Sequence, residues 1–322
     1  MLRVRTQFLP TTAKVLVSGT VLFWIIHDLE LKQVALVIAE ADALLLLLAF
    51  LMFFLGYLIT AFRWRLLLSA QGVSARIGFL VRSFIVAIFF NNLLPSTIGG
   101  DIVRVYDSWR LGNSRSGAAS VVIVDRLMGL LALASYALVT VISARELAGL
   151  VPALPALVLG ATLAVGSLAW FVFFAPRRLY QALEKYHAPG TAPPWRILAK
   201  IASAFSVFSG RRDLLGRAFG LSLLLQLNVI IHFIIVSRAL GIDIPVLAMF
   251  TVIPLSIFVT MLPVSINGIG LREGVFVFFF SAYGIGAVEA VAFAWVALGF
   301  VILQGIMGGI LFATRTEAKN PT

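Results

Sequence analysis

The sequence contains no cysteine, only three histidines and few charged residues, which make up 12% of its 322 residues. The absence of cysteine excludes disulfides, thiolate metal sites and cysteine nucleophiles. The histidines are scattered along the chain, which argues against a histidine-based metal site. Soluble domains carry about 25% charged residues, so this composition, with 61% hydrophobic residues, excludes a soluble enzyme, a nucleic-acid-binding module and a disordered regulator. We therefore expect an integral membrane protein that needs neither a metal nor an organic cofactor.

The formal net charge is +11, because basic residues outnumber acidic ones. In a membrane protein, basic residues collect in cytoplasmic loops, where they set the topology and meet anionic lipids. This effect accounts for the charge, and we expect no nucleic-acid partner.

Long apolar runs predict an all-α, polytopic membrane protein, because a transmembrane helix needs about 20 apolar residues. We treat residues 1–322 as a single transmembrane domain with about six full transmembrane helices. These predicted spans are residues 13–29, 42–62, 117–143, 151–175, 217–239 and 288–313. Two further apolar regions, 77–111 and 245–286, are interrupted in the middle by proline, glycine and charge, which is typical of discontinuous helices.

Loop charge predicts the orientation of these spans in the plasma (inner) membrane. Arg3, Arg5 and Lys14 favour a cytoplasmic N-terminus, with the first helix as an uncleaved anchor. The basic loop 176–217 is also expected in the cytoplasm, as is the C-terminus with Arg315.

The same rule predicts that the two broken regions are re-entrant hairpins of opposite orientation. Arg63 and Arg65 before the first hairpin, and Arg110 at its end, favour entry from the cytoplasm and return to it. Region 245–286 must then begin and end on the outer side.

An internal repeat supports this arrangement. The segment LPSTIGGDIVR (94–104) aligns without gaps with LPVSINGIGLR (262–272), so that the offset is 168 residues. The prolines, the glycines at 100 and 268 and the arginines at the two ends coincide. The sequence therefore predicts an inverted repeat with units at about 42–143 and 217–313, as in many transporters, with the substrate site at the repeat interface.

The broken hairpins are the candidate substrate site. Proline and glycine end the entering helix inside the bilayer, so the returning helix begins with free N–H groups that favour an anion. Arg104 and Arg272 lie in the first turn of the two returning helices and can donate to a phosphate or carboxylate. The neighbouring candidate residues are Gly99, Gly100, Asp101, Asn267, Gly268 and Glu273.

Other polar residues within apolar segments require partners. Asp125 and Arg126 are adjacent, and neighbours on a helix point in different directions. We expect Arg104 or Arg110 to pair with Asp125, and Asp101 or Asp107 to pair with Arg126. A structural brace and a lipid-binding role are both open for these pairs.

Asparagine, histidine, glycine and tryptophan add further expectations. Asn91 and Asn92 end the first entering helix and are expected to hydrogen-bond the unwound segment. Asn228 and His232 share a helix face, which predicts interhelical hydrogen bonds, while the Gly305–Gly309 pair predicts close helix packing. Trp64 is interpreted as an anchor at the membrane interface. In segment 196–209, the apolar face of Leu198, Ile201, Phe205 and Phe208 predicts an interfacial amphipathic helix.

Three motifs together resemble the lysylphosphatidylglycerol synthase transmembrane (flippase-like) family. They are FFNNLLPSTIGGDIVR (89–104), VDRLMGLLAL (124–133) and LPVSINGIGLREG (262–274). The resemblance implies translocation of a lipid between leaflets. The best-studied relatives carry a cytosolic aminoacyltransferase domain after the membrane region, whereas this chain resembles the stand-alone members of the family. The resemblance does not identify the lipid. Anionic or aminoacylated phospholipids, hopanoids and polyprenyl-linked lipids all stay open.

The leading functional hypothesis is therefore a lipid flippase or transporter without catalytic residues. Three alternatives stay open: an integral-membrane enzyme acting on a lipid head group, in which Asp101, Asp125 and Glu273 supply acid–base chemistry, a small-anion transporter, and an accessory subunit of a separate lipid-modifying enzyme. The sequence is also compatible with a homo-oligomer.

Overall fold

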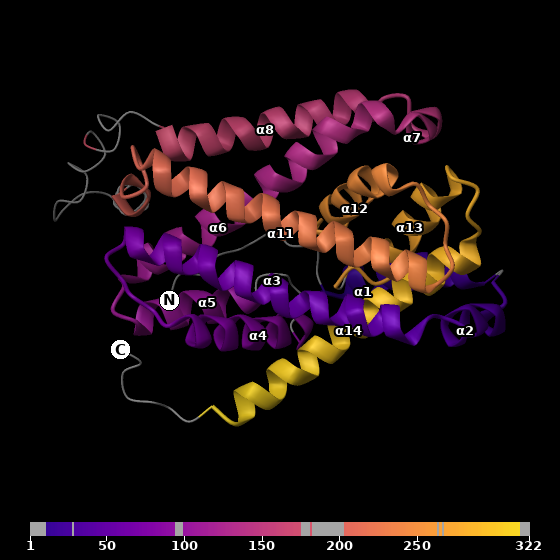
Figure 1. Ribbon diagram of the computed structural model, residues 1–322, viewed down its shortest axis with the longest axis horizontal. Coiled ribbons are helices and arrows are strands. Elements are labelled where there is room, and N and C mark those ends of the chain that lie inside the picture. Colours follow the sequence, from indigo (N-terminus) through magenta and orange to yellow (C-terminus); the bar gives the residue numbers. More distant parts are fainter. Residues whose placement is uncertain are drawn as a thin grey trace.

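The fold of the protein is given by a computed structural model, which describes residues 11–27, 29–93, 99–174, 181, 203–262, 264–265 and 267–315. In this part of the chain every regular element is a helix (Figure 1). The helices are α1 (Thr11–Ile26), α2 (Leu31–Ala39), α3 (Ala43–Ala70), α4 (Ile77–Leu93), α5 (Gly99–Arg110), α6 (Arg115–Thr140), the 3-10 helix η1 (Val141–Ser143), α7 (Arg145–Leu150), α8 (Leu154–Phe174), α11 (Arg212–Ala239), α12 (Val246–Thr260), α13 (Leu271–Ser281) and α14 (Ala287–Ala313).

Five of the described helices, α3, α6, α8, α11 and α14, are long and apolar enough to cross a membrane. They correspond to five of the six predicted spans. The remaining predicted span, residues 13–29, coincides with α1, which has 16 residues and is followed directly by the short helix α2. Large apolar side chains such as Leu44, Phe62 and Trp170 are exposed on the long helices, as expected where lipid chains surround them. The chain is an all-α, multi-pass membrane protein.

Local sequence explains where several helices begin. The side chain of Asp42 caps α3 by accepting hydrogen bonds from the backbone N–H groups of Leu44 and Leu45 at 2.8 and 3.0 Å. Ser114 caps α6 in the same way, accepting from the N–H of Gly117 at 2.9 Å.

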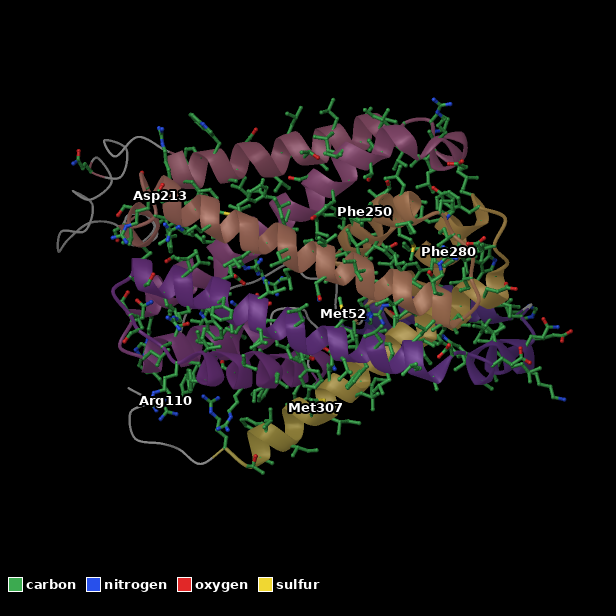
Figure 2. The ribbon with its side chains drawn as sticks, viewed as in Figure 1. Met52, Arg110, Asp213, Phe250, Phe280 and Met307 are labelled. Atoms are coloured by element: carbon green, nitrogen blue, oxygen red, sulfur yellow. The ribbon has the colours of Figure 1, made fainter. Side chains whose placement is uncertain are left out.

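Both interrupted regions form pairs of short helices. Helix α4 packs against α5, and α12 packs against α13, so each region is a helical hairpin rather than one long span. In Figure 1 the α4–α5 hairpin lies toward one end of the molecule and the α12–α13 hairpin toward the other, while α3, α11 and α14 extend between them. Arg110 and Asp213 lie at the first of these ends and Phe280 near the second (Figure 2).

The packing of these helices follows a pattern that exchanges the two halves. Helix α3 contacts α11 over much of its length, α4 contacts α14, and α12 contacts α6. If α3, α4, α5 and α6 are matched in order with α11, α12, α13 and α14, the last two contacts are counterparts of each other.

The buried apolar residues form two main clusters. One surrounds α12 and α13 and includes Phe276, Phe280 and Phe293, whose rings lie 4.8–5.6 Å apart between centroids. The other joins the end of α3 and the start of α4 to α6, α8 and the start of α11, with Trp64 and Phe208 fully buried. Each hairpin is therefore attached to a core of its own.

Two interpretations of the sequence are wrong in this region. Trp64 is not an interface anchor, because its side chain is completely buried within the bundle. Arg63 is not a loop residue either: α3 continues to Ala70 and buries its guanidinium against Asp125 and Ser222. The apolar run that ends at Arg63 and Arg65 predicts the end of a span, but the helix continues for about two more turns beyond Arg63.

The basic loop 176–217 lies largely outside the described residues, including Leu198 and Ile201 of the expected amphipathic face. Its last six residues belong to α11, and residues 203–206 are helical. Phe208 is fully buried in the protein core. This residue therefore does not form part of a lipid-facing surface, contrary to the expectation.

Candidate functional site

The break in the first hairpin is closed by Asn91, near the end of α4. Its side-chain oxygen accepts a hydrogen bond from the backbone N–H of Gly100 at 2.7 Å, at the start of α5. A Cβ atom at Gly100 would lie 2.4 Å from the carbonyl oxygen of Ala87, so only glycine permits this approach of the two arms. Asn91 therefore bonds the first turn of the returning helix, whereas the expectation was a bond to the unwound segment. Gly99 is buried beside Gly100, while residues 94–98 lie outside the described residues.

Asn92 connects the first hairpin to the second. Its side-chain amide donates to the carbonyl oxygen of Val301 in α14 at 2.7 Å, and its own carbonyl accepts from the Asn267 side chain at 3.0 Å. Asn267 lies in the break between α12 and α13. A Cβ atom at Gly305 would lie 2.4 Å from the Asn92 amide nitrogen, so this glycine allows the contact. The end of α4 therefore meets the break of the second hairpin, which is far away in sequence.

The break in the second hairpin requires left-handed backbone conformations. Asn267, Gly268 and Gly270 have φ angles of +51°, +77° and +78°. Glu273, which is buried, accepts a hydrogen bond from the N–H of Gly270 at 2.7 Å and so caps α13. This geometry uses the Glu273 carboxylate for the fold of the loop.

Arg272 is held next to this break and forms no ion pair among the described residues, although the neighbouring Glu273 carboxylate attracts it. One terminal nitrogen, Nη2, donates to the carbonyl oxygen of Asn267 at 3.1 Å, and the other, Nη1, is buried without a hydrogen-bond partner. One strong donor is therefore available to a ligand.

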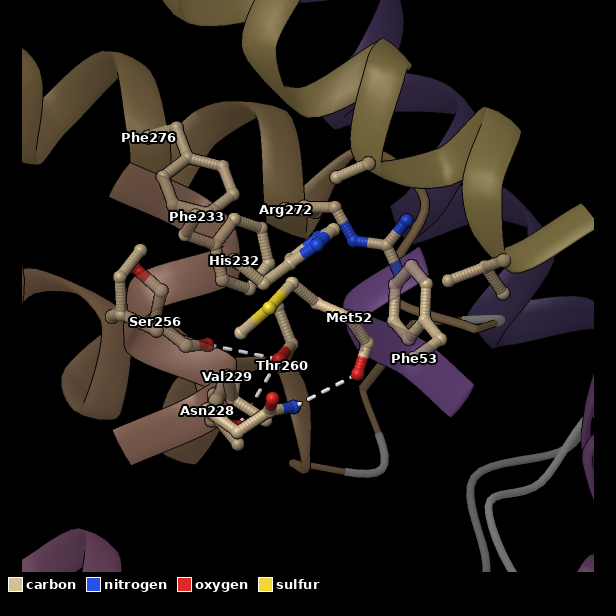
Figure 3. Close-up of a pocket in the computed structure, with 14 residues that line it drawn as sticks. Met52, Phe53, Asn228, Val229, His232, Phe233, Ser256, Thr260, Arg272 and Phe276 are labelled. Carbon is tan, nitrogen blue, oxygen red and sulfur yellow. Dashed lines mark hydrogen bonds between the residues drawn. The ribbon is translucent and has the colours of Figure 1, made fainter. Parts of the chain in front are cut away.

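Arg272 lines a cavity of about 180 Å³ between α3, α11, α12, α13 and α14. Most of the lining is apolar, and Figure 3 shows the Arg272 side chain extending past His232 toward Phe53. Ser256 Oγ of α12 and Asn228 Oδ1 of α11 also line the cavity and are buried without partners. Met52 of α3, which lines the cavity beside Asn228, lies about midway along the bundle (Figure 2). The cavity is apolar with a few unsatisfied polar groups, the composition that is typical of ligand sites.

The expected hydrogen bonds of α11 form one wall of this cavity. The Asn228 side chain donates to the carbonyl oxygen of Met52 at 3.2 Å, and His232 Nδ1 lies 2.8 Å from the carbonyl oxygen of Ala49. Both interhelical bonds join α11 to α3, and this prediction is confirmed.

Arg104, the counterpart of Arg272 in the first hairpin, has a different environment. Its Nη2 lies 2.9 Å from Asp125 Oδ2, and the Asp125 Oδ1 atom accepts from Arg63 Nε at 2.6 Å. The guanidinium of Arg104 also lies over the Trp64 ring, 4.5 Å from its centroid. All four side chains are buried. The expected Arg104–Asp125 pair is present, and Arg63 is a second partner that the sequence did not indicate.

The two carboxylates of α5 are also paired. Asp101 forms an ion pair with Arg126, as expected. Asp107 is completely buried and accepts from Ser83 at 2.5 Å and from Arg315 at 2.7 Å, so that it joins α4, α5 and the end of α14. Arg110 lies over Tyr106 instead of pairing with Asp125.

The two hairpins thus present their arginines differently. At the offset of 168 residues, the position of Asp125 is occupied by Phe293 and that of Trp64 by His232. The position of the carboxylate that pairs with Arg104 is therefore apolar in the second unit. The carboxylate beside Arg272 is that of Glu273, which attracts the guanidinium but forms no ion pair with it.

The described residues contain no group of three or more metal-ligating side chains that could hold a metal ion. Among the described residues, the buried charged side chains form ion pairs or, in the case of Glu273, a helix cap.

The chain was compared with known proteins and protein families. No curated protein matches it. The family model for the lysylphosphatidylglycerol synthase TM region matches residues 12–308, which include both hairpins, the Asp125 cluster and the cavity. This match covers most of the sequence, and the chain therefore belongs to the lysylphosphatidylglycerol synthase TM region family.

Proposed function

We propose that this protein is a transporter that moves a lipid with an anionic head group between the two leaflets of its membrane. Membership of the family indicates a membrane lipid-related function. The observation that carries the proposal is the guanidinium of Arg272, which forms no ion pair among the described residues and keeps one unbonded nitrogen in an apolar cavity at the break of the second hairpin. A charged side chain within a bilayer is costly, and such residues usually pair with another group or bind a substrate.

We further propose that the two hairpins are re-entrant and that units 42–143 and 217–313 form an inverted repeat. The exchange of contacts between α4–α14 and α12–α6 supports a twofold relation between the units. The meeting of Asn92 and Asn267 supports a common site at the hairpin breaks. In transporters of this kind, one unit moves against the other around such a site.

The two parts of the cavity suit the two parts of a lipid. Arg272 Nη1 lies where a phosphate or carboxylate can be bound. Phe53, Phe233 and Ile257 provide an apolar wall for the beginning of a hydrocarbon chain. Three residues at the first hairpin have a structural role in this proposal and do not contact the anion: Gly99, Gly100 and Arg126.

Transport can be measured with the purified protein in liposomes that contain a fluorescent anionic phospholipid, using a reductant that cannot cross the membrane. We expect Arg272→Ala to lower the rate of lipid exchange at least tenfold, because one lost charged hydrogen bond is worth roughly 1.5–3 kcal/mol. Arg272→Lys should recover part of the rate, since an ammonium lacks the planar fork.

The matched control is Arg238→Ala, which removes an exposed arginine paired with Asp243 on the same helical bundle. This variant should transport at the normal rate. The lipid should be recovered chemically unchanged, whereas a modified head group would indicate an enzyme. Normal transport by Arg272→Ala would place the site elsewhere.

A further inference from the structure

A cluster of aromatic and basic side chains lies where α5 ends and α6 begins. The rings of Tyr106 and Trp109 are 5.9 Å apart. The guanidinium of Arg110 lies over Tyr106 at 5.8 Å, and that of Arg115 lies over Trp109 at 4.7 Å. All four side chains are exposed, and Figure 2 shows Arg110 at the end of the bundle. They form one continuous surface with two positive charges.

Neither charge in this cluster is neutralised by the described part of the chain. The ion pairs of these residues do not include Arg110 or Arg115. The carboxylates of α5 are already engaged, Asp101 by Arg126 and Asp107 by Arg315. Both guanidinium groups are therefore available to bind an anion.

An apolar stripe continues from the cluster along α5. Ile102, Tyr106 and Trp109 are spaced by four and three residues, which places them on one helix face. Their exposed fractions are 62%, 47% and 39%. A hydrocarbon chain can lie along this stripe while its head group reaches the two arginines.

The corresponding face of α13 is covered by a helix. At the offset of 168 residues, Ile102 and Tyr106 correspond to Gly270 and Gly274. Helix α1 packs against these glycines: a Cβ atom at Gly270 would lie 2.6 Å from the carbonyl oxygen of Ser18. The bulky side chains at the α5 positions prevent such an approach, so this face is suited to a flexible lipid chain.

We propose that the face formed by Ile102, Tyr106, Trp109, Arg110 and Arg115 binds an anionic phospholipid of the surrounding leaflet. The guanidinium groups hold the phosphate while they stay on the aromatic rings. The rings lie at the level of the head groups, where tyrosine and tryptophan are favoured. This site is separate from the Arg272 cavity and does not depend on transport of a lipid there.

The proposal can be tested by quenching of tryptophan fluorescence with brominated lipids. Wild-type protein and Trp109→Phe are reconstituted in phosphatidylcholine bilayers that contain increasing fractions of dibrominated phosphatidylglycerol or dibrominated phosphatidylcholine. The difference in quenching between the wild type and Trp109→Phe reports which lipid lies beside Trp109. Each basic residue near an anionic surface is worth about 1 kcal/mol, or about fivefold. We expect a preference of at least fivefold for phosphatidylglycerol, which decreases at high salt.

In the double variant Arg110→Gln/Arg115→Gln, the two brominated lipids should quench the Trp109 fluorescence equally. The matched control is Arg65→Gln/Arg76→Gln, which removes two exposed arginines near the adjoining α3–α4 turn. This control should keep the preference. Equal quenching by both lipids in the wild type would overturn the proposal. An equal loss of preference in both double variants would also overturn it, because general surface charge would then explain the effect.

Discussion

Asp125 is the residue on which the charges of the first hairpin depend, because it lies between the guanidiniums of Arg63 and Arg104. We predict that Asp125→Asn lowers the free energy of unfolding by about 3–5 kcal/mol, since it leaves two buried cations without a carboxylate. Thermal unfolding of the purified protein in detergent measures this loss. Asp243→Asn is the control, because Asp243 is 87% exposed in its pair with Arg238 and should have almost no effect. Similar melting curves for the two variants would contradict the prediction.

Single residues show how far the sequence could predict the site. The Arg104–Asp125 and Asp101–Arg126 pairs were predictable, because a charge within an apolar helix needs a partner and few were available. Arg63 was not, since a charge at the end of an apolar run is usually a loop charge. The contact of Asn92 with Val301 depends on the packing of distant helices, and no local pattern indicates it.

At the level of elements, the contact between α4 and α14 is controlled by small residues. A Cβ atom at Gly308 would lie 2.3 Å from the carbonyl oxygen of Ile85, whereas a Cβ atom at Gly299 has no neighbour within 4 Å. We predict that Gly308→Ala separates the two helices and costs about 1–3 kcal/mol of unfolding free energy. Gly299→Ala, on the same helix, should be neutral or stabilising by up to about 1 kcal/mol, because alanine favours helix.

Unfolding of both variants under the same detergent conditions checks this difference. Equal stability would mean that α4 and α14 can adjust without cost. The predicted packing role of Gly305 and Gly309 is confirmed, because both lie close to side chains of α4. Gly308 lies closer still to α4.

The breaks of the hairpins were predictable at this level because proline, glycine and asparagine disfavour a continuous helix in a recognisable pattern. The cavity was not, because its walls come from five helices whose packing no single segment determines. The burial of Phe208 had the same origin, since an apolar helix face suits a protein core and a membrane surface equally well.

For the whole molecule, the proposed inverted repeat makes a specific prediction about sides of the membrane. The natural sequence has no cysteine, so single cysteines can be introduced without a background. Ser74 and Arg110 flank the first hairpin, while Asp243 and Ser281 flank the second, and all four are exposed. An impermeant maleimide should label the first two from one side only and the last two from the other side only.

A broken region that crosses the membrane once would place its two flanking positions on opposite sides, and this result would refute its re-entrant nature. Permeabilised cells provide the control, because all four cysteines should then react. The orientation predicted from loop charge places Asp243 and Ser281 outside the cell.

The pairing of Arg315 with Asp107 affects how the boundaries of the domain should be defined. The family match ends at residue 308, but the carboxylate of Asp107, which is completely buried, accepts a hydrogen bond from a side chain seven residues beyond that end. A domain boundary drawn at the end of sequence similarity would remove this partner and leave a buried negative charge uncompensated. For this chain the folded domain extends beyond the residues that match the family. Any shortened or fused version has to keep Arg315 in place.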